Sequence, residues 1–227
     1  MATATLRTGA LTAVYVALAV VDSTLAGRSD RRSRRLRLLT KPALMPVLHA
    51  SVRSVRGMEP GVRRGLTAAH ALSWAGDLAL LRKRKSAFLL GLGSFFGGHV
   101  AYLATFAGRR GPWRDADRRA PAAALALWGI AAPAMSWAAS RRDPSMGVPV
   151  AAYSTVLAAL LAASGIVEGD PGARRALQSG TALFLLSDSL LGLRMFVFSD
   201  EKPALDSAVM ATYTLAQAVI AGGLAHL

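Results

Sequence analysis

The sequence of 227 residues contains no cysteine and few acidic side chains. Without cysteine there is no disulfide framework, no cysteine-ligated zinc or iron–sulfur centre and no thiol nucleophile. Thirteen Asp and Glu against 27 Lys and Arg leave a formal net charge of +14 at pH 7. A nucleic-acid-binding protein would also be basic, but its basic side chains would decorate amphipathic elements. Here they fall between long apolar runs, which argues against nucleic acid as a partner.

Hydrophobic residues make up 53% of the chain. They occur in runs long enough for membrane helices, since about 20 such residues cross the roughly 30 Å of hydrocarbon in a bilayer. The loops between the runs are too short to fold by themselves. We therefore predict an all-α fold: a polytopic, multi-pass protein of the cell membrane whose single domain, residues 1–227, is a bundle of eight transmembrane helices. The predicted spans lie near residues 6–26, 36–52, 63–81, 86–107, 120–139, 148–167, 175–198 and 205–226.

The order of the spans sets the topology. Eight spans place both termini on the same side of the membrane, and nearly equal numbers of Lys and Arg on the two sides leave the orientation open. Residues 71–78 resemble residues 182–190, and each stretch places an aspartate inside an apolar helix. This similarity predicts a parallel repeat of four plus four spans. The abundance of Ala and Arg is typical of a bacterium with a GC-rich genome.

Ionisable side chains inside the predicted spans are the candidates for function, because each costs about 2.5–3.5 kcal/mol at mid-membrane. Asp77 and Asp188 lie within apolar runs, and Asp22 and Lys41 lie at a depth similar to that of Asp77. Lys41 can either pair with a carboxylate or extend to the lipid headgroups, whereas Asp22 is expected at the interface. Helical spacing places further polar residues on shared faces that are expected to point into the bundle: His70, Ser73 and Asp77; His99 and Tyr102; Tyr213 and Gln217.

Four short stretches, in this order along the chain, resemble the YhhN family of membrane proteins. They are Thr40-Lys41-Pro42, Ser73-Trp74-Ala75-Gly76-Asp77, the helix with Phe88, Gly91, Phe96, His99 and Tyr102, and Ser187-Asp188-Ser189 followed by Tyr213 and Gln217. The resemblance extends over more than half of the chain and leaves the fifth and sixth spans unmatched. Trp74 departs from the pattern, since a smaller aliphatic residue is expected there, and it is predicted to reshape the pocket.

Characterised YhhN proteins are lysoplasmalogenases, so the resemblance implies a lysophospholipid substrate. Its vinyl-ether bond would be hydrolysed to a fatty aldehyde and a glycerophospho-ethanolamine or -choline. Vinyl ethers are stable to base and cleaved by acid, so the difficult step is proton transfer to an alkene carbon. That step needs a carboxylic acid kept protonated by an apolar site, and a second carboxylate to stabilise the resulting cation. No metal or other cofactor is required.

The predicted catalytic residues are Asp77 and Asp188, which are expected to meet closely enough to share a proton, with the choice of general acid left open. The predicted supporting residues around the substrate are Lys41, Ser73, His99, Tyr102, Ser187, Tyr213 and Gln217. Membrane lipids are expected to contact the rest of the protein.

Two other functions fit the same residues. The first is a zinc-dependent intramembrane lipid amidase with His70, His99 and Asp77 as ligands, although these positions lack the usual spacing of zinc ligands. The second is a non-enzymatic small transporter or lipid-binding membrane protein in which the two aspartates relay protons.

Overall fold

The computed structural model describes residues 2–227 apart from 54, 56, 83, 113–116 and 199–201, and only the backbone of residues 2–7. Nearly all of the described chain is helical, with one isolated antiparallel bridge between Arg110 and Val167. The long helices are α1 (Ala2–Ala26), α2 (Arg31–Arg53), α3 (Pro60–Leu80), α4 (Lys85–Ala107), α5 (Arg119–Arg142), α6 (Gly147–Ser164), α7 (Pro171–Gly192) and α8 (Pro203–Ala225). A 3-10 turn, η2 (Pro144–Met146), precedes α6, and a π-helical turn, η3 (Leu193–Val197), extends α7.

Each of the eight long helices coincides with one predicted span. Among the described residues, six helices are long and apolar enough to cross a membrane: α1, α4, α5, α6, α7 with η3, and α8. This pattern makes the chain a multi-pass helical membrane protein. The prediction of eight equivalent spans is supported only for these six, because α2 contains six arginines and Lys41, and α3 contains Arg63, Arg64 and Asp77. Membrane crossing by α2 and α3, and the four-plus-four repeat, remain predictions.

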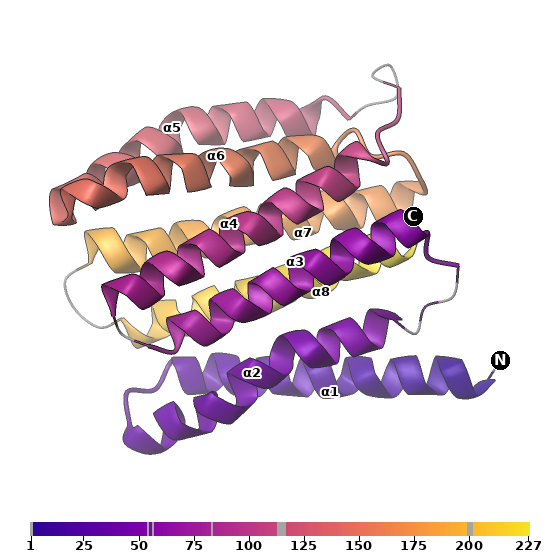
Figure 1. The fold of residues 1–227 in the computed structure, drawn as a ribbon, viewed down its shortest axis with the longest axis horizontal. Helices are drawn as coiled ribbons and strands as arrows, with labels where there is room; N and C mark the ends of the chain where they lie inside the picture. Colours follow the sequence, from indigo (N-terminus) through magenta and orange to yellow (C-terminus); the bar gives the residue numbers. More distant parts are fainter. Residues whose placement is uncertain (1, 54, 56, 83, 113–116, 199–201) are drawn as a thin grey trace.

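Consecutive helices pair into hairpins, and the hairpins form layers (Figure 1). The α3/α4 and α7/α8 hairpins make the centre of the bundle, with α3 against α8. The α1/α2 hairpin covers one side of this centre through α3 and α8, and the α5/α6 hairpin covers the opposite side through α4 and α7. Helix α1 begins at the end of the bundle where α8 ends, as an even number of passes requires.

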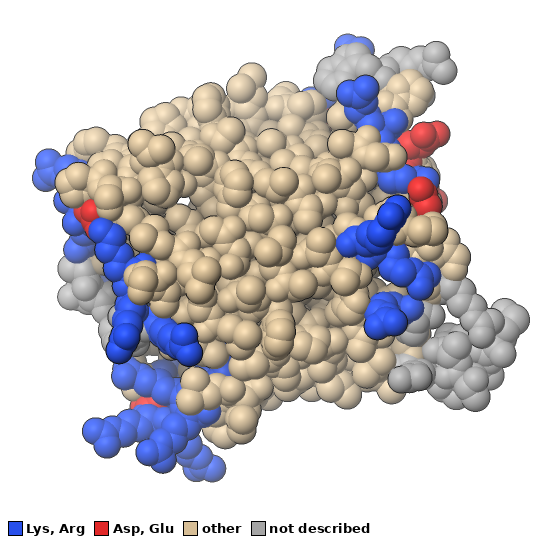
Figure 2. Space-filling view, in the orientation of Figure 1, with Lys and Arg blue, Asp and Glu red and all other residues tan. Residues whose placement is uncertain are grey.

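The surface separates charge from apolar atoms along the bundle. On the face shown in Figure 2, Lys and Arg gather at both ends of the helices, and a band without charged side chains lies between them. Large apolar side chains are exposed along the helices, among them Val20 of α1, Leu90 of α4 and Ile130 of α5. Such an apolar girdle is the surface that lipid tails would cover, because exposing it to water would be unfavourable.

Two prolines inside α2 explain the role of Trp74. Pro46 has no backbone N–H, so the carbonyl of Pro42, four residues earlier, loses its helical partner. Trp74 of α3 replaces that donor, because its Nε1 lies 2.8 Å from the Pro42 carbonyl oxygen. The indole therefore ties α3 to the backbone beside Lys41, and its effect on the shape of a pocket stays a prediction.

Small residues let α4 approach α3 closely near Asp77. A Cβ on Gly76 would lie 2.6 Å from ring atoms of Phe95, and one on Gly91 would lie 2.8 Å from Leu80. The ring of Phe95 can therefore lie against the α3 backbone at the residue before Asp77. Close approach through small residues is the usual basis of helix packing in membranes.

An ion pair at one end of the bundle provides a prediction about stability. Lys85, the first residue of α4, lies 2.5 Å from Asp143 in the turn between α5 and α6, and the hydrogen bond from Lys85 lowers the pKa of Asp143 to about 2. A carboxylate whose pKa falls on folding stabilises the folded state above its unfolded pKa, and that contribution disappears as the pH falls through about 2. Because both side chains are partly exposed, we expect Asp143→Asn to lower the unfolding temperature in detergent by only roughly 2 °C or less at pH 7.

The same measurement repeated between pH 7 and pH 2 should show the two proteins converging as Asp143 becomes protonated. A difference that persists unchanged at the lowest pH would contradict an electrostatic origin.

Candidate active site in the bundle interior

The first group of buried polar side chains surrounds Asp77 of α3. Lys41 of α2 lies 3.0 Å from Asp77 Oδ1, and the hydroxyl of Tyr213 of α8 donates to Oδ2 at 2.7 Å. The side chain of Asp77 is 1% exposed and that of Lys41 is 8% exposed. Lys41 Nζ also lies 3.4 Å from the sulfur of Met210. Lys41 therefore points into the bundle as the counter-ion of Asp77, and the alternative in which it extends to the headgroups is wrong.

The second group surrounds Asp188 of α7. The hydroxyl of Tyr153, on α6, donates to Asp188 Oδ2 at 2.7 Å and lies 3.0 Å from Nε2 of His99 on α4. The hydroxyl of Tyr153 has one proton, which it donates to Asp188. The oxygen of the same hydroxyl therefore accepts a hydrogen bond from His99, so His99 carries a proton on Nε2. The other ring nitrogen, Nδ1, is buried without a hydrogen-bond partner among the described residues. The side chain of Asp188 is 12% exposed, so this carboxylate is the more accessible of the two.

Aromatic rings connect the two groups. The ring of Phe184 lies edge-on to both Tyr213 and His99, with centroid distances of 5.6 and 4.5 Å. Phe95 covers Tyr213 from α4 at 5.7 Å. These rings exclude water from the space between the carboxylates, and contacts between charges are stronger where water is excluded.

A third chain of hydrogen bonds lies beside these groups and is completely buried. Tyr102 donates to Gln217 Oε1 at 2.7 Å, and Gln217 Nε2 donates to Ser73 at 3.0 Å. The predicted supporting residues Ser73, Tyr102 and Gln217 thus form one continuous network across α3, α4 and α8. Ser187, also a predicted supporting residue, instead donates to the Val209 carbonyl at 3.1 Å and holds α7 to α8.

That Asp77 and Asp188 share a proton stays a prediction. The two carboxylates accept hydrogen bonds from different tyrosines, and no hydrogen bond links them to each other among the described residues. Asp22 is completely buried and bound by Arg37 at 3.2 Å and Thr40 at 2.6 Å, so it faces the protein interior, and its interfacial depth stays a prediction.

The three predicted zinc ligands are directed toward different partners. His70 Nδ1 lies 3.3 Å from Nδ1 of His49, while His99 contacts Tyr153 and Asp77 contacts Lys41. Across the described parts of the chain, no three His, Asp or Glu side chains are grouped in a way that would hold a metal ion. The ligand set of the amidase alternative is therefore not assembled.

Tyr153 is the polar residue at this site that sequence reasoning missed. It lies on α6, within the region that offered no resemblance. One signal could have identified it: Tyr153 is the only aromatic residue of α6. A tyrosine inside a membrane helix usually finds a hydrogen-bond partner when it is buried.

These observations define the class of protein: a multi-pass helical membrane protein with a buried carboxylate, Asp77, and a partly buried one, Asp188, in chemically different surroundings inside its bundle. The YhhN family model matches residues 36–224, which is most of the chain, and the protein therefore belongs to the YhhN family. Comparison with curated proteins and with solved structures returned no match. Family membership supports a hydrolase in general terms.

Proposed function

We propose that the protein is a lysoplasmalogenase-like hydrolase that cleaves the vinyl-ether bond of a lysophospholipid by aspartate acid–base catalysis. The observation that carries this proposal is the difference between the two carboxylates. Asp77 is paired with the ammonium group of Lys41, whereas Asp188 accepts a hydrogen bond from the neutral hydroxyl of Tyr153. Titratable groups whose environments differ in this way are suited to opposite roles in acid–base chemistry.

Asp188 is the better general acid of the two. Tyr153 holds its Oδ2, and Oδ1 receives no hydrogen bond from a described residue. In its protonated form, Asp188 transfers a proton from Oδ1 to the outer alkene carbon of the vinyl ether and becomes a carboxylate. The ether carbon becomes an oxocarbenium ion, water adds to it, and the proton that this water releases returns to Asp188. The hemiacetal then collapses to an aldehyde and an alcohol, so only water is consumed.

Asp77 supports the same step electrostatically. Lys41 and Tyr213 hold the two oxygens of its carboxylate, and both contacts favour the ionised form, so we assign the negative charge of the site to Asp77. A preorganised charge in an environment that excludes water stabilises a developing cation more strongly than the same charge does in water. The separate partners of Asp77 and Asp188 suit these two different roles.

The test is product analysis with detergent-purified protein and a 1-alkenyl lysophosphatidylethanolamine. Fatty aldehyde should form, and in D2O it should carry one deuterium on the carbon next to the aldehyde group, because that carbon takes its proton from the acid. The matching 1-alkyl ether lacks the alkene and should not react. Cleavage of the alkyl ether at a similar rate, or failure to form any aldehyde, would refute the proposal.

Tyr153→Phe should reduce kcat about tenfold, the effect of losing one oriented hydrogen bond. KM should change little, because Tyr153 acts on Asp188 and not on the substrate. Tyr15→Phe is the matched control: it removes a buried hydroxyl that donates to the Thr214 carbonyl at 2.7 Å and does not contact Asp188. Equal losses of kcat in the two variants would show that Tyr153 has only a general structural role.

A further inference from the structure

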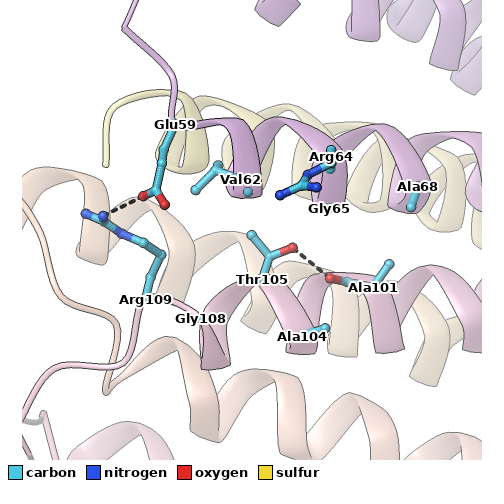
Figure 3. A pocket seen from close by; sticks show the side chains of 11 residues that line it. Glu59, Val62, Arg64, Gly65, Ala68, Ala101, Ala104, Thr105, Gly108 and Arg109 are labelled. Atoms are coloured by element: carbon cyan, nitrogen blue, oxygen red, sulfur yellow. Dashed lines mark hydrogen bonds and ion pairs between the residues drawn. The ribbon is translucent and has the colours of Figure 1, made fainter.

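A furrow on the surface lies between the beginning of α3 and the end of α4, away from both carboxylates (Figure 3). Its volume is about 440 Å³, which falls in the range of roughly 300–1,000 Å³ found for small-molecule sites. Small side chains line its length: Gly65 and Ala68 from α3, and Ala101 and Ala104 from α4. Glu59 and Arg109 lie at one end of it, and Arg64 lies beside Gly65 on the α3 side.

The furrow exists because α3 and α4 touch through small residues at its base. A Cβ on Gly65 would lie 1.9 Å from the hydroxyl oxygen of Thr105, so only glycine permits this approach. Thr105 turns that hydroxyl back to the Ala101 carbonyl at 2.7 Å and presents no free donor to the furrow. The walls are therefore narrow and apolar, a shape that suits a hydrocarbon chain lying along the helices.

The outer end of the furrow is positively charged. Arg109 donates through Nη1 to Glu59 at 2.8 Å and through Nη2 to the Leu227 carbonyl at 3.3 Å. Its third donor, Nε, is buried without a partner among the described residues. Arg64 is exposed on the opposite wall and forms no ion pair with a described residue. The furrow is thus lined by two guanidinium groups and one carboxylate, so its charged side chains are net positive.

The furrow is separate from the proposed active site. Asp77 lies thirteen residues beyond Arg64 on α3, which corresponds to about 20 Å along the helix. Arg64 lies in the second turn of α3 and Arg109 just after the end of α4, so both lie near helix ends, the level at which phospholipid headgroups would lie. Guanidinium groups bind phosphate oxygens strongly.

We propose that this furrow binds a membrane phospholipid, with its phosphate at the guanidinium groups of Arg64 and Arg109 and the first part of an acyl chain along Gly65, Ala68, Ala101 and Ala104. The site needs both parts of the ligand, because Gly65, Ala68, Ala101 and Ala104 offer no polar side chain and the guanidinium groups alone are open to water. The proposal is independent of the hydrolase activity.

The test uses protein reconstituted in phosphatidylcholine nanodiscs that contain a trace of phosphatidylglycerol with a photoreactive diazirine near the start of one acyl chain. Labelling should map by mass spectrometry to the first half of α3 and the last half of α4. Ala68→Leu with Ala104→Leu fills the furrow and keeps both arginines, and it should reduce this labelling at least about fivefold. Arg64→Gln should also reduce it, whereas Arg63→Gln, one residue away and outside the furrow, should not.

Excess unlabelled phosphatidylglycerol should compete for the site, and inorganic phosphate should not. If labelling of α3 and α4 is unchanged in the protein with Ala68→Leu and Ala104→Leu, the proposal is overturned. Equal competition by inorganic phosphate would also overturn it, because the acyl chain would then contribute nothing to binding.

Discussion

Asp188→Asn should lower the rate of fatty-aldehyde formation at least about 10³-fold, because an amide cannot transfer a proton to the alkene carbon. The substitution keeps the size of the side chain, and the amide oxygen can still accept the hydrogen bond from Tyr153. The protein should therefore fold normally while the chemical step fails. The measurement is initial rate of aldehyde release from 1-alkenyl lysophosphatidylethanolamine, with the folded fraction quantified by size-exclusion chromatography in the same detergent.

Asp206→Asn is the matched control for this experiment. Asp206 also lies in an apolar helix next to a basic side chain, since it pairs with Arg194 at 3.1 Å, but its side chain is 35% exposed and does not contact Asp188. This variant should retain nearly full activity. If Asp188→Asn also retained activity, Asp188 would not be the acid; if Asp206→Asn lost as much, the loss would reflect charge removal anywhere in α7 and α8.

Lys41→Met should destabilise the protein by about 3–5 kcal/mol, the usual effect of leaving a buried charge without its partner. The methionine fills similar space, so the loss comes from Asp77, which retains only the hydrogen bond from Tyr213. The double variant Lys41→Met with Asp77→Asn has no unpaired charge and should recover most of the lost stability. Such recovery is the signature of a coupled pair, and a double-mutant cycle measures it directly.

Unfolding in detergent, followed by tryptophan fluorescence, gives the four stabilities of this cycle. The pair between Arg37 and Asp22 provides a comparison within the same helix α2, because the Arg37 side chain is 23% exposed and remains partly hydrated. Its cycle should show a smaller coupling energy. Strictly additive effects of Lys41→Met and Asp77→Asn would mean that the two side chains do not stabilise each other in the folded protein.

The positions of the helices could be predicted from the sequence because hydrophobicity along a chain is a local property. Runs of about 20 apolar residues specify helices of membrane length, and all eight predicted spans coincide with helices. Proline at the first position of α3, α7 and α8 marks where each begins, since the missing N–H has no helical partner there in any case. The polar residues that need partners could also be listed in advance, because a charge in an apolar run is visible without coordinates.

The partners themselves depended on the packing of distant helices. The depth of Lys41 in the membrane predicted a carboxylate partner, but depth could not distinguish Asp22 from Asp77. In the tertiary structure Asp22 pairs with Arg37, and Asp77 pairs with Lys41. Tyr153 was missed because a tyrosine in an apolar helix carries no charge, and its role appears only when α6 lies against α4 and α7. Likewise, a proton shared by Asp77 and Asp188 would require both side chains to point toward the same place. The rotation of a helix about its axis sets where its side chains point, and all of its neighbours together decide that rotation.

The sequence by itself thus determined that this chain forms membrane helices and which of its side chains cannot face lipid. Only the tertiary structure decided which of those side chains meet, that the two carboxylates have separate partners, and that a furrow with an arginine at each wall opens between α3 and α4. The reason is physical: the cost of placing a polar group in hydrocarbon is local to that residue, whereas a hydrogen bond between helices requires their relative rotation and depth, which the whole bundle sets at once.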